Sequence, residues 1–171
     1  MSDIPIAIVG AGYMAEEHIK ALKFIGGCNI VGISSRTIKK ARQLAKKYNI
    51  PVVATNIKEL HCNTVAVGVI IAVNELSTTT ILAEAMEFNW QILCEKPIGL
   101  YPSDAKLFEQ NASNRNTGLF VALNRRFYST TETAKTKLEG DDGNRLIEIH
   151  DQEDPNTALA SGRPTEVVKQ W

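Results

Sequence analysis

The sequence contains no long apolar run and no recognisable targeting segment. No stretch of about 18 apolar residues is free of charge, so no transmembrane helix and no membrane partner are expected. The first ten residues hold no Lys or Arg and lead straight into a strand-like run, so no signal peptide is expected. With 171 residues, 44% hydrophobic and 22% charged, the chain fits one ordinary globular domain, or one domain and part of another.

Cysteine and histidine are also scarce, with three of each. Cys28, Cys62 and Cys94 are odd in number and widely spaced, which excludes a disulfide scaffold and fits no metal or redox motif. We therefore predict buried, reduced thiols in a cytoplasmic protein. The histidines show no ligand spacing either, so no metal site is expected.

Acidic residues are missing from one long segment. The whole chain is balanced, with 19 basic and 19 acidic residues, yet the segment from His18 to Lys58 holds nine Lys and Arg and no Asp or Glu. Such a segment attracts anions, either nucleic acid or a phosphorylated small molecule. The basic face has no interleaved aromatics and faces away from an intact apolar stripe, so a solvated helix face is favoured and no nucleic-acid partner is expected.

The periodicity alternates between strand and helix along most of the chain. Strands are predicted at 4–9, 29–33, 51–53, 64–73, 91–94 and 118–123, and helices at 14–24, 38–48, 77–88 and 104–114, with Thr37 and Ser103 as caps. This alternation is typical of an α/β fold, a Rossmann-type doubly wound parallel sheet. The pattern changes near residue 124, which predicts a domain at 1–124 and a different segment at 125–171. In that segment we expect a helix at 128–138, a turn at 140–143, a strand at 145–150, a loop at 151–163 and a new element from 166.

A glycine-rich turn follows the first predicted strand and opens the first predicted helix. Gly10-x-Gly12-x-x-Ala15 stands where the dinucleotide fingerprint requires it. Gly10 allows the tight turn, Gly12 lets the backbone approach a pyrophosphate, and Ala15 is small enough for the helix to pack on the strand. The alternative is a plain strand-to-helix turn.

The end of the second predicted strand bears on the choice of dinucleotide. NAD binders usually carry Asp or Glu there, whereas this chain has Ser35 and Arg36 within the acid-free segment. Ser35 can donate a hydrogen bond, and Arg36 can pair with a 2′-phosphate and stack on adenine. We therefore favour NADP over NAD; the alternative for Arg36 is an ordinary exposed arginine before a helix.

Cys94-Glu95-Lys96-Pro97 stands at the carboxyl end of a predicted strand, the edge where open α/β sheets bind ligands. The Lys96 ammonium could reach the nicotinamide end of a cofactor, hold a substrate hydroxyl and help to move its proton. Pro97 would stiffen the turn, with a cis Lys-Pro bond as one hypothesis. A charged turn without function is the alternative.

Together these segments resemble one family. The order and spacing of the glycine turn with His18, of Ser34-Ser35-Arg36, of Glu95-Lys96-Pro97 and of Asn124-Arg125-Arg126-Phe127 are similar to the glucose–fructose oxidoreductase / inositol dehydrogenase (Gfo/Idh/MocA-type) family. The resemblance covers residues 4 to about 150. One departure lies at Ala72-Val73-Asn74, where the family shows Thr-Pro-Asn followed by a His.

The resemblance implies an NAD(P)-dependent oxidoreductase of sugars, polyols or nucleotide sugars. It makes Lys96 the catalytic lysine, and it extends the cofactor contacts to Tyr13, Met14, Ala72, Asn74, Glu95 and Asn124. It also implies that 125–171 is the incomplete start of a second α+β domain for substrate binding and homo-oligomer formation. The chain alone is then expected to be inactive. Two alternatives stay open: a non-catalytic NAD(P)-binding module or sensor, and an unrelated Rossmann protein that uses a nucleotide sugar or mononucleotide.

Overall fold

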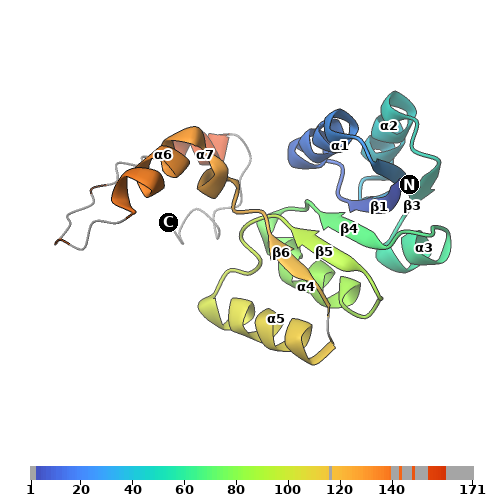
Figure 1. Cartoon of the computed structure of the whole chain (residues 1–171). Coiled ribbons are helices and arrows are strands. Elements are labelled where there is room, and N and C mark those ends of the chain that lie inside the picture. Colours follow the sequence, from blue (N-terminus) through green and yellow to red (C-terminus); the bar gives the residue numbers. More distant parts are fainter. Residues whose placement is uncertain (1–2, 116, 140–142, 144–147, 149–153, 161–171) are drawn as a thin grey trace. The chain divides into compact units, whose positions relative to one another are not determined.

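The computed structural model describes residues 3–115, 117–139, 143, 148 and 154–160. The chain divides into two units, Met1–Ala122 and Leu123–Trp171. The first unit holds the sheet (Figure 1).

The first unit is built on one six-stranded sheet in which every neighbouring pair is parallel. Its spatial order is β3-β2-β1-β4-β5-β6, the order of a doubly wound dinucleotide-binding fold. The predicted fold class is therefore confirmed for this sheet. The strands are β1 (Ile4–Val9), β2 (Cys28–Ser34), β3 (Val52–Ala54), β4 (Gly68–Ile71), β5 (Gln91–Cys94) and β6 (Leu119–Val121).

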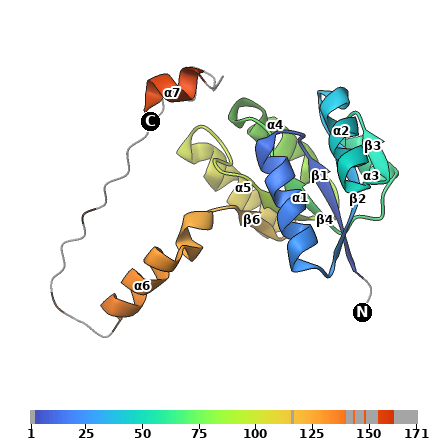
Figure 2. The same ribbon diagram turned by 90° about the horizontal axis from the view of Figure 1, so that it is seen from above.

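Helices cover both faces of the sheet, as the two views of the ribbon show (Figures 1 and 2). They are α1 (Tyr13–Ile25), α2 (Ile38–Tyr48), α3 (Ile57–Cys62), α4 (Glu75–Ala85) and α5 (Pro102–Arg115). One buried cluster joins α1 and α2 to the sheet around Ile8 and Ile33. A second cluster joins α3, α4 and α5 to the opposite face around Ile71 and Phe108. Successive strand residues alternate between the clusters, as the pleat requires.

The long apolar run at 64–73 forms a shorter strand than its hydrophobicity predicts. Only Gly68–Ile71 is strand, because the ladders to β1 and to β5 both cover these four residues alone. All four are buried. Before them, Val65 and Val67 are 78% and 51% exposed. An apolar run therefore identified the central strand, and the partner strands set its length.

One short-range signal explains a helix that the periodicity did not resolve, and the predicted start of another helix was wrong. Helix α3 begins after Asn56, whose side chain accepts the N–H of Glu59, while Glu59 reaches back to the N–H of Thr55. These reciprocal bonds resemble a capping box and satisfy donors at a helix start. The start of α5 was placed wrongly, because the helix begins at Pro102 and Ser103 lies within it.

The second unit contains the 3₁₀ turn η1 (Asn124–Phe127), α6 (Ser129–Leu138) and α7 (Pro155–Ala160). Helix α6 confirms the helix predicted at 128–138. Helix α7 contradicts the loop predicted at 151–163: Asp154 accepts the N–H of Asn156, and proline is well suited to a first helical position because it has no N–H to satisfy. The strand predicted at 145–150, most of the turn at 140–143 and the element from 166 lie outside the described residues.

The prediction of buried thiols is correct for one cysteine. Cys94 is fully buried on β5, Cys28 is partly buried, and Cys62 is exposed at the end of α3. All three are free thiols. The position of Cys62 in the last turn of a short helix leaves it uncovered, which composition alone could not reveal.

Candidate functional site

The carboxyl ends of four strands meet along one edge of the sheet. Val9 is in register with Ser34 on one side and with Ile71 on the other, and Ile71 is in register with Cys94. The order of the strands reverses between β1 and β4 at this edge. In open α/β sheets, ligands bind at such a switch point.

Residues predicted for the site follow these strand ends directly. Gly10, Ala72 and Glu95 each donate the backbone N–H to the carbonyl oxygen of the last residue of the neighbouring strand, at 2.8, 2.8 and 2.9 Å. These bonds continue the ladder for one more step and fix the backbone where each loop leaves the sheet. The structure thus brings together the predicted positions at 10, 35, 72 and 95, which are far apart in the sequence.

The two glycines of the turn have different structural roles. Gly10 has φ +117°, a conformation that L side chains rarely adopt, and a Cβ there would overlap the carbonyl oxygen of Ala72. Gly12 has φ −92°, which other residues tolerate, and a Cβ there would meet nothing within 4 Å. The fold therefore requires glycine at position 10. At position 12 the structure leaves open space, which a phosphate group could occupy.

The N-terminus of α1 faces this open space with free donors. The N–H of Glu16 is the first to bond within the helix, to the oxygen of Gly12 at 3.1 Å. The N–H groups of Tyr13, Met14 and Ala15 therefore have no acceptor in the helix, and Gly12 brings no side chain to cap them. Free donors and the positive end of the helix dipole together favour an anion.

The side chains of this first turn differ in exposure. Tyr13 is 75% exposed and Met14 38%, whereas Ala15 is fully buried in the cluster beneath α1. Ala15 thus packs the helix on the sheet, as its small size predicts. Its side chain cannot touch a bound molecule, so any contact made by this residue would come from its backbone.

The loop after β2 presents a hydroxyl and a guanidinium. The Ser35 hydroxyl oxygen accepts the N–H of Thr37 at 3.1 Å, which leaves its own hydrogen available to donate. Thr37 occupies the N-cap position of α2 but makes no capping bond with its side chain. Arg36 is exposed, and no ion pair of the described residues includes it.

Asn74 has a structural task in this fold. Its side-chain oxygen accepts the N–H of Ser77 at 3.0 Å, and its backbone oxygen accepts the hydroxyl of Thr78 at 3.1 Å. Both bonds stabilise the start of α4. Asn74 still lies three residues after the carboxyl end of β4, where its backbone borders the site.

The turn after β5 holds Lys96 at the same edge. The Lys96 side chain is exposed, and the Lys96–Pro97 peptide bond is cis, as hypothesised from the sequence. Glu95 accepts the N–H of Lys96 through Oε2 at 3.2 Å. Burial, together with the charge of Glu95, raises the pKa of the Cys94 thiol to about 12, so this thiol stays protonated and is no nucleophile.

One residue of the site was not predicted as such. His18 on α1 places Nε2 at 2.8 Å from Oε1 of Glu95. The two residues are 77 positions apart, so no local pattern pairs them. His18 belongs to the sequence motif that carries the family resemblance. The signal that could have placed it near Glu95 is the strand order of a doubly wound sheet, in which the helix after β1 lies close to the ends of β4 and β5.

Asn124 lies in the second unit, where it begins η1. Its proposed contact with the cofactor stays a prediction.

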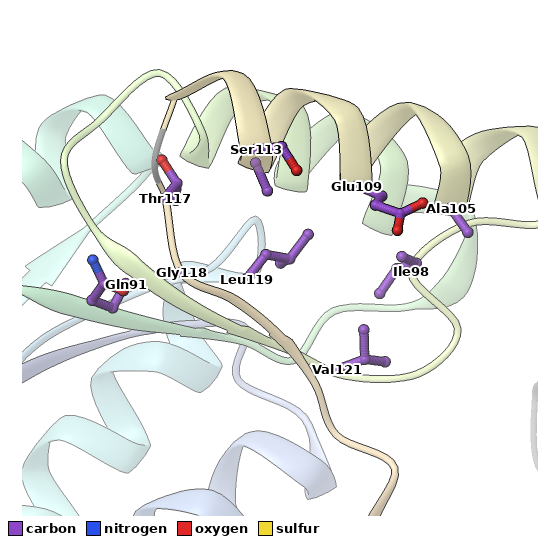
Figure 3. Close-up of a pocket in the computed structure, with 10 residues that line it drawn as sticks. Gln91, Ile98, Ala105, Glu109, Ser113, Thr117, Gly118, Leu119 and Val121 are labelled. Atoms are coloured by element: carbon purple, nitrogen blue, oxygen red, sulfur yellow. The ribbon is translucent and has the colours of Figure 1, made fainter.

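A groove of about 690 Å³ lies elsewhere on the first unit, between α5 and the edge strand β6 (Figure 3). The side chains of Leu119 and Val121 point from β6 toward α5, with Glu109 and Ser113 on the helix opposite. None of the predicted site residues lines it. We place the functional site at the glycine turn, because the free donors and the exposed lysine are there.

The described residues offer neither a cluster of metal ligands nor a membrane-spanning helix. No group of three His, Cys, Asp or Glu side chains is arranged to hold a metal ion there. No helix within the same residues is long and apolar enough to cross a membrane.

Comparison with known proteins assigns the fold to a family. A family model described as "Oxidoreductase family, NAD-binding Rossmann fold" matches residues 4–123. The trans-1,2-dihydrobenzene-1,2-diol dehydrogenase of Sus scrofa is 25% identical over 134 residues, which are 77% of this chain and 40% of that protein. The glucose-6-phosphate 3-dehydrogenase of Bacillus subtilis is 23% identical over 154 residues, 90% of this chain and 43% of that protein.

A solved structure agrees with this assignment at the level of fold. GenD2 from gentamicin A biosynthesis, solved in complex with NAD, superposes with a TM-score of 0.77 at 20% identity, covering 82% of this chain and 40% of GenD2. The chain thus spans about two fifths of the length of the proteins it matches. The matched residues include the whole sheet and the turn of Lys96, and the chain belongs to the Gfo/Idh/MocA oxidoreductase family with its NAD-binding Rossmann fold.

Proposed function

We propose that this chain is the cofactor-binding part of an NAD(P)-dependent oxidoreductase that acts on a sugar, a polyol or a nucleotide sugar. The observation that carries the proposal is that the predicted site residues follow the carboxyl ends of neighbouring strands at one edge of the sheet. An open glycine turn, the free donors of α1 and an exposed lysine all meet there. The names of the relatives support the class of reaction, since both are dehydrogenases.

The residues present fit a dinucleotide. The N–H groups of Tyr13, Met14 and Ala15 would hold its pyrophosphate beside Gly12, where the structure leaves open space. The backbone of Ala72 and Asn74 and the side chain of Glu95 would border its nicotinamide half. The nicotinamide ring supplies the hydride chemistry when the cofactor is bound.

Lys96 is the proposed catalytic residue. Its ammonium group would hydrogen-bond the oxygen of the carbon that is oxidised or reduced, and it would exchange a proton with that oxygen. The side chain is exposed at the carboxyl edge, so it is free to reach a substrate.

We further propose that residues 125–171 begin a substrate and oligomerisation domain, that the whole protein is a cytoplasmic homo-oligomer, and that this chain alone does not turn over. A proton-transfer group without a substrate wall to orient the reactants and exclude water catalyses poorly. Neither nucleic acid nor a membrane is among the proposed partners.

NADP is the proposed cofactor in preference to NAD, because Ser35 and Arg36 replace the usual carboxylate. Fluorescence titration of the chain with NADPH and NADH tests this choice. We expect NADPH to bind more tightly, and Arg36→Ala to remove about tenfold of that preference. Arg42→Ala, a similarly exposed arginine on α2, is the control. Tighter binding of NADH by the unaltered chain would refute the assignment.

One observation favours a second function, a non-catalytic NAD(P)-binding module or sensor. The chain lacks the Thr-Pro and the His that the family shows around Asn74, and the Asn74 side chain caps α4. Kinetics of the whole protein decide between the two functions. If it is an enzyme, Lys96→Ala should reduce turnover by about 10²–10⁴-fold with cofactor affinity nearly unchanged. Cofactor binding without turnover on any sugar or polyol would favour the module.

A further inference from the structure

A partly buried contact joins the helix of the glycine turn to the turn of the proposed catalytic lysine. His18 Nε2 and Glu95 Oε1 are 2.8 Å apart, and the two side chains are only 18% and 14% exposed. A carboxylate accepts hydrogen bonds, so Nε2 of His18 carries the hydrogen in this contact. In the other three ion pairs of the described residues, at least one partner is 50% or more exposed.

Glu95 is held at three points. Its backbone N–H bonds to Ile71 at 2.9 Å, Oε1 meets His18, and Oε2 accepts the N–H of Lys96 at 3.2 Å. The carboxylate therefore connects α1 to the backbone of the very residue that carries the ammonium group. Hydrogen bonds to an ionised group in a partly buried place are stronger than neutral ones.

We propose that His18 is a positioning residue for Lys96. By holding one oxygen of Glu95, His18 orients the other oxygen toward the Lys96 N–H and so fixes the backbone from which the lysine side chain extends. Because His18 stands on the helix whose first turn faces the proposed phosphate site, it also couples that turn to Lys96. The inference rests on the function proposed above for Lys96, but the contact itself exists without any cofactor.

Amide hydrogen exchange in the cofactor-free chain tests the proposal at one atom. In His18→Leu, the Lys96 amide should exchange roughly tenfold faster than in the unaltered chain, because Glu95 loses its fixed orientation. The amide of Ile92, bonded to Gly118 at 2.8 Å, is the internal reference for global opening. Lys20→Leu, which removes an exposed pair on the same helix, should leave Lys96 unchanged.

Two conservative variants separate positioning from general packing. Glutamine can place a donor about where Nε2 of histidine lies, and asparagine is too short to do so. His18→Gln should therefore restore slow exchange at Lys96, and His18→Asn should not. If His18→Leu does not fold, comparison of the Gln and Asn variants still tests whether His18 positions Lys96. Equal Lys96 exchange in the Gln and Asn variants would overturn the proposal, as would exchange in a folded Leu variant that matches the unaltered chain.

Glu95→Gln provides an independent test. Its side-chain oxygen can still accept from His18, but the amide nitrogen on its other arm cannot accept the Lys96 N–H. We expect fast exchange at Lys96 in this variant, and slow exchange would contradict the proposal. Titration of the unaltered chain with NADPH distinguishes the two proposals. If the variants exchange as expected but the unaltered chain binds no dinucleotide, the proposed function alone is refuted. If the unaltered chain binds NADPH but the variants leave Lys96 exchange unaffected, the role of His18 alone is refuted.

Discussion

Replacing the two glycines of the turn one at a time should separate folding from binding. Gly10→Ala forces a side chain into φ +117° and against the carbonyl of Ala72. The backbone conformation costs about 1–2 kcal/mol, and relief of the overlap costs about 1–3 kcal/mol. The lower entropy of the unfolded alanine chain offsets about 0.4–1 kcal/mol.

Net destabilisation of about 1–4 kcal/mol is therefore expected for Gly10→Ala, which lowers the urea midpoint by about 0.5–2 M at a slope near 2 kcal/mol per M. Gly12→Ala should behave differently, because its φ of −92° suits alanine and its Cβ meets nothing within 4 Å. Its midpoint should stay the same or rise slightly.

For dinucleotide binding, Gly12→Ala should be the more damaging of the two substitutions, although it is the milder one for stability. The new methyl group of Gly12→Ala would stand in the space proposed for the pyrophosphate, so NADPH affinity should fall at least tenfold in a protein that is fully folded. Urea unfolding followed by circular dichroism and fluorescence titration measure the two effects. The reasoning is refuted if Gly12→Ala binds NADPH normally, or if Gly10→Ala unfolds at the same urea concentration as the unaltered chain.

Three further predictions concern the core, the thiols and one carboxylate. Phe108→Ala should lower the free energy of unfolding by about 3–5 kcal/mol, whereas Leu107→Ala should change it by less than about 0.5 kcal/mol, because Phe108 is 1% and Leu107 51% exposed. Iodoacetamide should label Cys62 well before Cys94, because Cys62 is exposed whereas Cys94 is buried with a pKa of about 12. Mass spectrometry of peptides taken early in the reaction measures the order of labelling, and labelling of Cys94 before Cys62 would contradict the account. Hydrogen bonds from Lys47 and Tyr48 of α2 lower the pKa of Glu16 from its ordinary value of 4.5. The ionised Glu16 carboxylate therefore stabilises the fold above pH 4.5, and this stabilisation is lost as the pH falls through the lower pKa of the folded state. Urea midpoints of Glu16→Gln should show less loss in that pH range than those of the unaltered chain.

The periodicity of the sequence predicted the sheet because the strands and the longer helices carry their own apolar patterns. Gln91–Cys94 matches its predicted strand fully, and α2 follows the stripe of Ala41, Leu44 and Ala45. Strand lengths were less predictable, since the ladders decide where a strand such as β4 begins. Helix α7 was missed because six residues are too few to show a helical period.

The candidate site was predictable wherever a motif has a local cause. The glycine turn, Ser35 and Lys96 all follow strand ends, and parallel strands bring such ends to one edge. Two features depended on tertiary structure. Burial of Ala15 makes it a packing residue, and the bond between His18 and Glu95 joins segments 77 positions apart. A short sequence pattern reveals neither the burial of a side chain nor a contact between distant segments.

The most direct test of the account is to map dinucleotide binding onto the chain by ¹⁵N–¹H NMR. Titration with NADPH should shift the backbone amides of residues 10–16, 35–37, 72–74 and 95–96, which lie at the carboxyl edge of the sheet. The amides of Glu109 and Ser113, which line the groove beside β6, should not move. Shifts confined to that groove, or no shifts at millimolar NADPH and NADH, would contradict the claim that this edge is a cofactor site.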